Sequence, residues 1–99
     1  MVEKSMKIYQ SRSFAKKVKK FSEKEKSELD SEIRRIIENP SLGSEKKGDL
    51  RGIFVHKFTV QSQIYLLAYR CIKDESLELV MIGPHENYYR DLKTYLRSG

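Results

Sequence analysis

The first part of the chain carries hydrophobic residues at the spacing of a helix. From Ser11 onward, Phe14, Val18 and Phe21 recur at intervals of four and three residues, which is one stripe of an α-helix. Lysines occupy the other sides of this stripe. The preceding segment, residues 7–10, has the composition of a short strand. The pattern therefore predicts a strand followed by an amphipathic helix.

A second helix is predicted directly after the first. Ser22 is followed three residues later by Glu25, which is the pattern of a capping box at a helix start. The apolar side of this helix is formed by Leu29, Ile33, Ile36 and Ile37. The helix must end before Pro40, because a residue that precedes proline disfavours helical backbone. We therefore expect two antiparallel helices joined at Ser22.

The second half of the chain changes to the pattern of strands. A polar loop with two glycines, residues 41–49, comes first. Three strand-like runs follow, at residues 53–60, 64–71 and 77–82. Their short connections, residues 61–63 and 72–76, predict a meander of antiparallel strands.

Gly83 and Pro84 break the last strand, and a final helix is predicted after them. Tyr88, Leu92 and Tyr95 form its stripe, and the helix extends to about Arg97. The predicted order is β-α-α-β-β-β-α. This order is typical of an α+β fold in which a helix pair packs on a small, mostly antiparallel sheet. The length of 99 residues predicts a single domain over residues 1–99.

Composition indicates the cellular location of the protein and the class of partner that it binds. The net charge is +6 and the isoelectric point is about 9.5. Residues 1–22 hold seven lysines and arginines against one glutamate, which favours nucleic acid or an acidic protein as partner, although a merely solvated surface fits as well. With no apolar run long enough for a membrane, no signal peptide and one cysteine, we expect a soluble cytoplasmic protein.

The candidate chemistry rests on two histidines. No histidine, cysteine or carboxylate spacing typical of a metal site is found, and no glycine-rich loop predicts a nucleotide cofactor. RNA supplies its own nucleophile, the 2′-hydroxyl, so histidines and cations alone are sufficient to cleave it. Histidine transfers protons near neutral pH, which makes His56 and His85 the natural candidates.

The two histidines have different settings. Strand alternation places His56 on the same side as Phe54, Phe58 and Val60, so it is either a buried structural histidine or a functional one. His85 follows Gly-Pro at a strand exit, where side chains reach solvent and function is often found. Lys57 alternates against His56, so the two reach one site only if the strand bends or ends nearby.

Several short motifs together resemble a known family. They are LRG at Leu50–Gly52, HKF at His56–Phe58, YLLAYR at Tyr65–Arg70 and GPHENYYRDL at Gly83–Leu92. With the predicted order of elements, they resemble the RelE/ParE superfamily of bacterial type II toxins. The resemblance implies a toxin that a cognate antitoxin protein holds inactive. In the RelE branch it implies an endoribonuclease that needs no metal and cuts mRNA, in many members on the ribosome.

The resemblance also implies roles for particular residues. Lys57 matches the family's cation on the second strand, with His56 beside it, and His85 matches the late catalytic position. Tyr88 is placed like the family's aromatic residue that stacks on a base or assists proton transfer. Several members have an arginine where this chain has Leu66, so Arg51 or Arg70 would have to supply that charge.

The resulting hypothesis is a toxin endoribonuclease. His85 is its expected general acid and His56 its candidate base, with Lys57 and Arg51 holding the phosphate. The residues expected to bind RNA or the ribosome are Lys16, Lys17, Lys19, Lys20, Lys47, Arg70 and Tyr88. Two alternatives remain: a ParE-like inhibitor of DNA gyrase without nuclease activity, and a nucleic-acid-binding module without chemistry.

Overall fold

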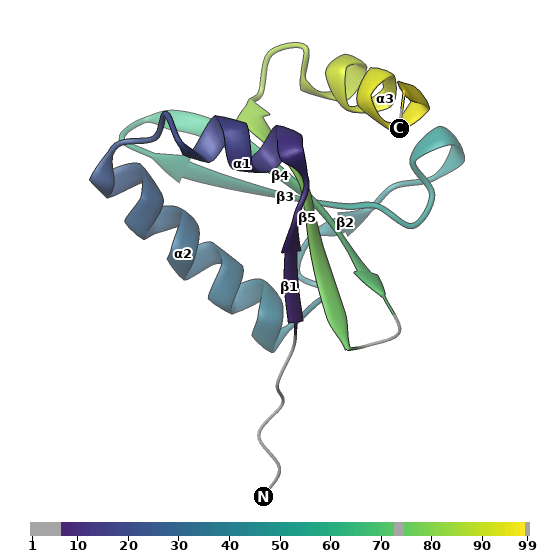
Figure 1. Ribbon diagram of the computed structural model, residues 1–99, viewed down its shortest axis with the longest axis horizontal. Helices are drawn as coiled ribbons and strands as arrows, with labels where there is room; N and C mark the ends of the chain where they lie inside the picture. Colours follow the sequence, from purple (N-terminus) through teal and green to yellow (C-terminus); the bar gives the residue numbers. More distant parts are fainter. Residues whose placement is uncertain (1–6, 73–74, 99) are drawn as a thin grey trace, which may run out of the picture.

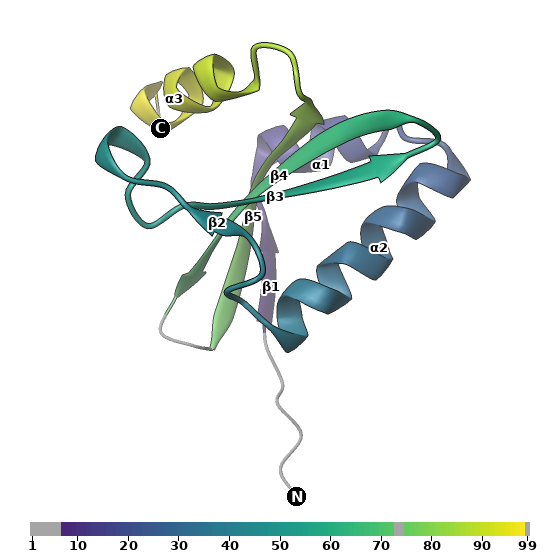
Figure 2. The same ribbon diagram turned by 180° about the vertical axis from the view of Figure 1, so that it is seen from behind.

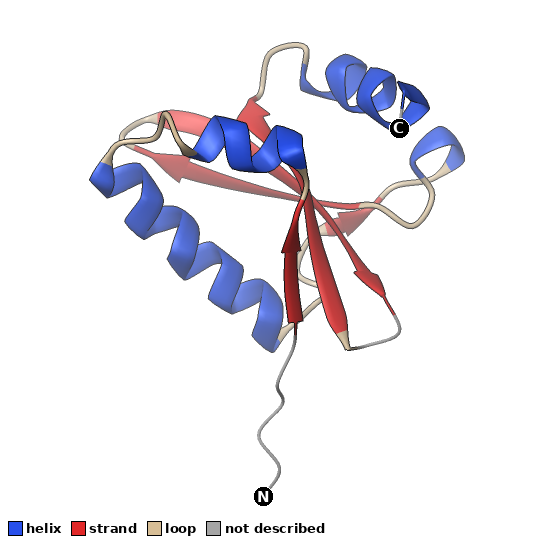
Figure 3. Ribbon diagram, viewed as in Figure 1, coloured by secondary structure: helices blue, strands red, loops and turns tan. Residues whose placement is uncertain are grey.

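The computed structural model describes residues 7–72 and 75–98, which form three helices and a five-stranded sheet (Figures 1 and 3). In chain order the elements are β1 (Lys7–Gln10), α1 (Arg12–Val18), α2 (Glu23–Glu38), β2 (Ser44–Glu45), the 3₁₀ turn η1 (Gly48–Leu50), β3 (Phe54–Val60), β4 (Gln63–Ile72), β5 (Ser76–Pro84) and α3 (Tyr88–Ser98). The predicted α+β class and the order of its helices and longer strands are confirmed. Strand β2 lies inside residues 41–49, which were predicted as a plain loop, and turn η1 begins there and ends at Leu50.

The two N-terminal helices begin at serine caps. The Ser11 hydroxyl accepts a hydrogen bond from the Phe14 N–H at the start of α1. At the start of α2, the Ser22 hydroxyl accepts from the Glu25 N–H, and the Glu25 carboxylate accepts from the Ser22 N–H at 2.7 Å. The predicted capping box is therefore confirmed, and it fixes the point at which the chain reverses between α1 and α2 (Figure 1).

The sheet has the strand order β1-β5-β4-β3-β2. Strands β3, β4 and β5 form the predicted antiparallel meander, and β1 pairs parallel to β5 at the edge. Strand β2 pairs with β3 through Ser44 opposite Val55 and Glu45 opposite Phe54. This short strand went unpredicted because its residues are polar. It forms because it satisfies backbone groups that an open β3 edge would leave unpaired.

The hairpin between β3 and β4 is tighter than predicted. Val60 pairs with Gln63, so the turn consists of Gln61 and Ser62 alone, and Gln63 already belongs to β4. Gln61 has φ 49° and Ser62 has φ 71°, the left-handed backbone that two-residue hairpins adopt because it matches the twist of their strands. Of the turn predicted at residues 72–76, residues 73 and 74 lie outside the described part of the chain.

Strand β5 contains one extra residue relative to β4. Ala68 pairs with Met81 but Tyr69 pairs with Leu79, so Val80 is a β-bulge. The Val80 carbonyl accepts a hydrogen bond from the Ser11 hydroxyl, and the Leu79 carbonyl accepts one from the Ser11 N–H. The start of α1 is thereby attached to the bulge.

The sheet buries both of its faces, against different helices (Figures 1 and 2). On the first, here called the helix-pair face, Phe14 of α1 and Leu29 and Ile36 of α2 pack on the strands. On the second, the α3 face, Tyr88 and Leu92 of α3 pack on the strands. The buried strand residues of the helix-pair face are Phe58, Val60, Leu67, Tyr69, Leu77, Leu79 and Ile82. Those of the α3 face are Val55, Leu66, Ala68, Val80 and Met81. No described helix is long and apolar enough to span a membrane.

Candidate active site

Lys57 and His85 lie on the same face of the sheet. Lys57 of β3 is paired with Leu66 of β4, and Leu66 is paired with Gly83 of β5. Paired residues of neighbouring strands point to the same side, and Leu66 packs in the cluster of the α3 face. His85 follows Gly83 by two positions, so it continues the same side just beyond the end of β5.

The bulge at Val80 decides this arrangement. Leu77 and Leu79 pack on the helix-pair face, whereas Val80 and Met81 both pack on the α3 face. A regular strand would alternate without interruption and would direct residue 85 to the helix-pair face. For a strand with the residues that β5 contains, the bulge therefore keeps the late histidine on the side of Lys57.

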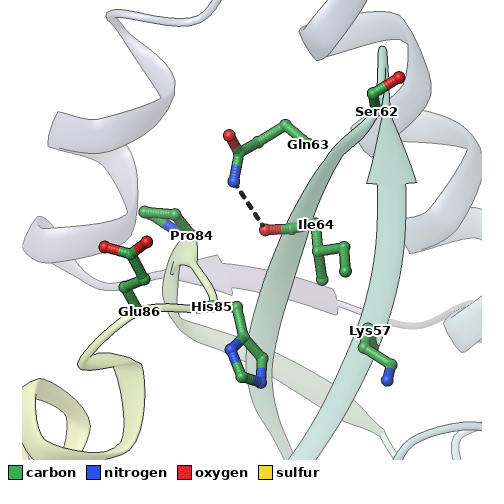
Figure 4. Close-up of a pocket in the computed structure, with 7 residues that line it drawn as sticks. All are labelled: Lys57, Ser62, Gln63, Ile64, Pro84, His85 and Glu86. Carbon is green, nitrogen blue, oxygen red and sulfur yellow. Dashed lines mark hydrogen bonds between the residues drawn. The ribbon is translucent and has the colours of Figure 1, made fainter.

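Lys57 and His85 line two adjoining hollows on the α3 face. The central hollow, of about 430 Å³, is lined by Lys57, Ser62, Gln63, Ile64, Pro84, His85 and Glu86. The α3-side hollow, of about 200 Å³, is lined by Ser44, Lys46, Val55, Lys57, Leu66, His85 and Tyr89. Figure 4 shows the Lys57 and His85 side chains extending to the same side, with Ile64 between their strands, whereas the Glu86 carboxylate points away from the imidazole.

The polar groups of these hollows are available to a ligand. His85 and Lys57 are exposed, and no side chain in the described residues hydrogen-bonds to the imidazole or the Lys57 ammonium. The Lys46 ammonium lies 5.2 Å from the centre of the Tyr89 ring in a cation–π contact. The hollows thus combine one imidazole, two ammonium groups and one aromatic ring. That set can bind a phosphodiester and donate a proton to it.

His56 is not brought to this site. Its side chain is only 10% exposed, and its Nε2 lies 2.6 Å from Oε1 of Glu32 in α2. Its ring stacks on Phe58 with centroids 6.0 Å apart. The same carboxylate oxygen of Glu32 accepts a hydrogen bond from Arg35 at 3.0 Å. Of the two readings of His56, the structure matches the buried one, because neighbouring residues of an unbent strand face opposite sides.

Tyr88, expected to contact RNA, is buried instead. It is 2% exposed, and its hydroxyl donates a hydrogen bond of 2.7 Å to the Met81 carbonyl. Burial raises the pKa of its phenol. Tyr88 belongs to the same stripe as Leu92, which packs in the cluster of the α3 face. The neighbouring Tyr89 lines the α3-side hollow, and it was missed because the motif alone does not say which tyrosine faces the core.

Neither arginine expected to hold the phosphate lines the two hollows. Arg51 is exposed in the loop after η1, and Arg70 pairs with Glu78 across β4 and β5. Arg70 lies four residues along β4 from Leu66, about 13 Å away at the rise of a strand. The cation found beside Lys57 is Lys46, which sequence reasoning missed because it lies in a polar segment with no repeating pattern.

The lysines in α1 and directly after it divide into two pairs. Lys17 and Lys20 line a third hollow, here called the α1-side hollow, together with Phe21, Glu25, Gln63, Tyr65, Gly83 and Pro84. Lys16 and Lys19 are exposed but do not line it, and Lys47 is exposed just before η1. The predicted group of RNA-binding lysines is therefore spread over several surfaces. Within the described residues, no three histidine, cysteine or acidic side chains are grouped to hold a metal ion.

Comparisons with known proteins were made for both sequence and structure. The model of a family described as ParE-like toxins of type II bacterial toxin–antitoxin systems matches residues 8–93. No curated protein sequence matches. The structure is similar to solved structures of the E. coli toxin RelE, three of which are described next. Their sequence identities to this chain are low, so the similarity establishes the fold alone.

The first of these structures is the intact E. coli RelBE toxin–antitoxin complex, with 17% identity, a TM-score of 0.66, and coverage of 83% of this chain and 99% of that one. The second is the isolated RelE toxin, with 17% identity, a TM-score of 0.64, and coverage of 91% and 98%. The third is a mutant RelE in the free state, with 16% identity, a TM-score of 0.70, and coverage of 94% and 97%.

Proposed function

Because this chain belongs to the family of ParE-like toxins of type II bacterial toxin–antitoxin systems, we propose that it is a metal-independent endoribonuclease that cleaves mRNA through the 2′-hydroxyl. One observation carries the proposal: the His85 imidazole, which has no hydrogen-bond partner among the described residues, shares two open hollows with the Lys57 ammonium. An exposed histidine contributes little to packing, so its position beside a lysine is better explained by chemistry than by stability.

His85 is the general acid in this proposal. The 2′-oxygen forms a bond to phosphorus, the bond from phosphorus to the 5′-oxygen breaks, and the His85 imidazolium donates its proton to the departing oxygen. The proton of the 2′-hydroxyl is lost to solvent, to which the hollow is open. Lys57 and Lys46 stabilise the negative charge that develops on the phosphorane.

His56 has a structural role in this proposal and not that of the general base. Its imidazole lies on the helix-pair face beside Glu32, separated from the central hollow by the sheet itself. In this proposal Tyr89 contacts RNA in place of Tyr88, because the Tyr89 ring lines the α3-side hollow. Arg51 and Arg70 have no part in binding the scissile phosphate, because neither lines these hollows.

The proposed mechanism is tested by the ends of the products. Attack by the 2′-hydroxyl leaves a 2′,3′-cyclic phosphate, or the 3′-phosphate formed from it, and a 5′-hydroxyl on the downstream fragment. Purified protein should give these ends with EDTA present, and a single 2′-deoxy at the scissile nucleotide should block cleavage. Products with 5′-phosphates, or cleavage of the deoxy substrate, would show that the mechanism is wrong. If ribosomes are required, the same end groups are measured on ribosome-bound mRNA, which would place the activity in the cytoplasm.

The proposed protein partner is a cognate antitoxin. The RelE chain similar to this one forms a complex with an antitoxin in the RelBE structure, and type II toxins take their name from such pairing. The surplus of positive charge, +6 over the whole chain, favours an acidic partner segment. Co-purification of the chain with the product of a neighbouring gene, with loss of toxicity, is the expected result.

A second candidate function is favoured by the family description. The matching family is named for ParE-like toxins, and ParE-branch toxins inhibit DNA gyrase and have no nuclease activity. The two candidates differ in what stops growth after induction. Rapid loss of full-length mRNA supports the nuclease, whereas DNA breaks with intact mRNA support gyrase inhibition. The His85→Ala variant is the matched control, since it should abolish the first effect and leave the second.

A further inference from the structure

We propose that the α1-side hollow is a second nucleotide subsite, in which Lys17 and Lys20 bind a phosphate of single-stranded RNA and Phe21 contacts the adjoining base. The proposal rests on the proposed nuclease function and extends it. It places a nucleotide that neighbours the cleaved bond in the substrate. It also divides the lysines in and directly after α1 into a pair that contacts RNA and a pair that does not.

The α1-side hollow is continuous with the central hollow. Both are lined by Gln63 and Pro84, so the two hollows adjoin where β4 begins and β5 ends, and a strand that leaves His85 reaches the α1-side hollow by passing these two residues. The volume of the α1-side hollow is about 290 Å³, at the lower end of small-ligand sites, which begin at roughly 300 Å³. The two hollows therefore accommodate neighbouring units of one linear ligand.

The charges of the α1-side hollow favour an anion. Lys17 and Lys20 are exposed, and the one acidic residue that lines the hollow, Glu25, has both carboxylate oxygens occupied. One accepts from the Ser22 N–H at 2.7 Å and the other from the Tyr65 hydroxyl at 2.6 Å. The Ser22 amide and then the Tyr65 hydroxyl lower the pKa of Glu25, so it stays ionised without needing either lysine.

The aromatic rings of the hollow are held in place before any ligand binds. Phe21 and Tyr65 are half-buried, with ring centroids 5.5 Å apart. The bond to Glu25 raises the pKa of Tyr65 to about 12, so its hydroxyl remains a donor at neutral pH. Fixed rings next to cations are the combination that binds single-stranded nucleic acid, because every base has a π-face and every linkage a charge. A peptide of acidic residues alone, such as poly-glutamate, would use the lysines but has no flat face to place against the rings.

The first test is a binding measurement with uncleavable RNA. A trinucleotide and a hexanucleotide, both 2′-O-methylated throughout, are titrated with the purified chain at several salt concentrations. The K17A/K20A variant should bind the hexanucleotide about as weakly as the wild type binds the trinucleotide. Its slope of log K against log salt should fall in magnitude by about 0.7, the value for one neutralised phosphate on a single strand.

The matched control is K16A/K19A, which removes the same charge from the same segment, α1 and the residues directly after it, outside the hollow. It should change the affinity less and leave the salt slope nearly intact. Phe21→Leu, which keeps the apolar packing, should weaken hexanucleotide binding about tenfold, the size of one base stack, with the salt slope unchanged. Equal losses in the two lysine pairs would overturn the subsite, as would competition by poly-glutamate as effective as competition by the hexanucleotide.

These outcomes are separate from those of the nuclease test. If the wild type cleaves no RNA but K17A/K20A selectively weakens hexanucleotide binding, the subsite stands and the nuclease proposal falls. If RNA is cleaved with the expected ends but K17A/K20A leaves the KM ratio of hexanucleotide to trinucleotide unchanged, the subsite falls and the nuclease stands.

Discussion

The two histidines lie on opposite faces of one sheet and have opposite surroundings. On the helix-pair face, α2 covers His56, whose imidazole is bonded to Glu32 and stacked on Phe58. On the α3 face, α3 covers only part of the strands, and His85 lies in the uncovered part beside Lys57. The residue type is therefore not what assigns a function. Coverage by a helix consumes the hydrogen-bonding capacity of one imidazole and leaves that of the other available.

The largest effect is expected from His85→Ala. Loss of one general acid should reduce RNA cleavage by about 10²–10⁴-fold, while the free energy of unfolding changes by less than about 0.5 kcal/mol because the side chain is exposed. Cleavage rates and urea denaturation of the same preparations measure both. Unchanged toxicity at matched expression would show that His85 has no part in the mechanism. The two histidines would then no longer differ in function.

His56→Ala should show the reverse pattern. It leaves the Glu32 carboxylate, whose side chain is 14% exposed, without one of its partners, so the free energy of unfolding should fall by about 1–3 kcal/mol. Cleavage per folded molecule should stay close to that of the wild type. The control is His56→Gln, which retains a donor to Glu32 and should lose less stability. A loss of cleavage in a fully folded His56→Ala protein would show that this face takes part in catalysis.

The two neighbouring tyrosines repeat the comparison on one helix. Tyr88→Phe removes the buried hydrogen bond to Met81 and should lower stability by about 1 kcal/mol without changing RNA binding. Tyr89→Leu removes the ring that Lys46 contacts and should weaken RNA binding with little change in stability. Thermal unfolding and oligonucleotide titration of both variants are the measurements. If Tyr88→Phe weakened RNA binding and Tyr89→Leu did not, the assignment of the RNA contact to Tyr89 would be wrong.

The smallest effect is expected at the β3–β4 turn. Gln61 and Ser62 hold left-handed backbone without being glycine, and the sequence Asn-Gly suits both positions better. Gln61→Asn with Ser62→Gly should raise the free energy of unfolding by about 0.5 kcal/mol, because the relief of left-handed strain is partly offset by the greater freedom of glycine in the unfolded chain. Because Ser62 lines the central hollow, cleavage is measured alongside. A destabilised double variant would mean that the Gln61 and Ser62 side chains stabilise the hairpin by more than their left-handed backbone costs.

The helices and longer strands could be predicted because each carries a repeating pattern. Phe14 and Val18 lie in α1 as their spacing predicted, although the helix ends at Val18 and Phe21 follows it, and the Ser22 capping box marked the start of α2. Alternation placed His56 with Phe58 and Val60. Strand β2 could not be predicted, because the only reason for its two polar residues to be extended is the edge of β3. Tertiary pairing decided that element.

The candidate site was predictable in its chemistry but not in its geometry. His85 and Lys57 were identified from residue type and family resemblance, and the structure lines one hollow with both. Lys46 and Tyr89 were missed because their position depends on how α3 and the segment after α2 cross the sheet. Arg51 and Arg70 were expected at the site because Leu66 stands where several family members have an arginine, and one of the two would have to supply its charge. The distance along the strand separates Arg70 from it, and the loop after η1 holds Arg51 outside the hollows.

Alternation beyond the bulge at Val80 makes the site sensitive to the length of β5 as well as to its composition. Deleting the single codon for Val80 would remove the extra residue, and Met81 opposite Ala68 would then follow directly on Leu79 opposite Tyr69, so the histidine would keep its side. One residue inserted between Ile82 and Gly83 would instead direct the histidine toward the helix pair, because a shift of one residue moves a side chain to the other face. Every side chain proposed to act on RNA would still be encoded. Among cells selected to survive induction of the intact gene, in-frame gains of one codon late in β5 should therefore appear alongside substitutions of the histidine itself.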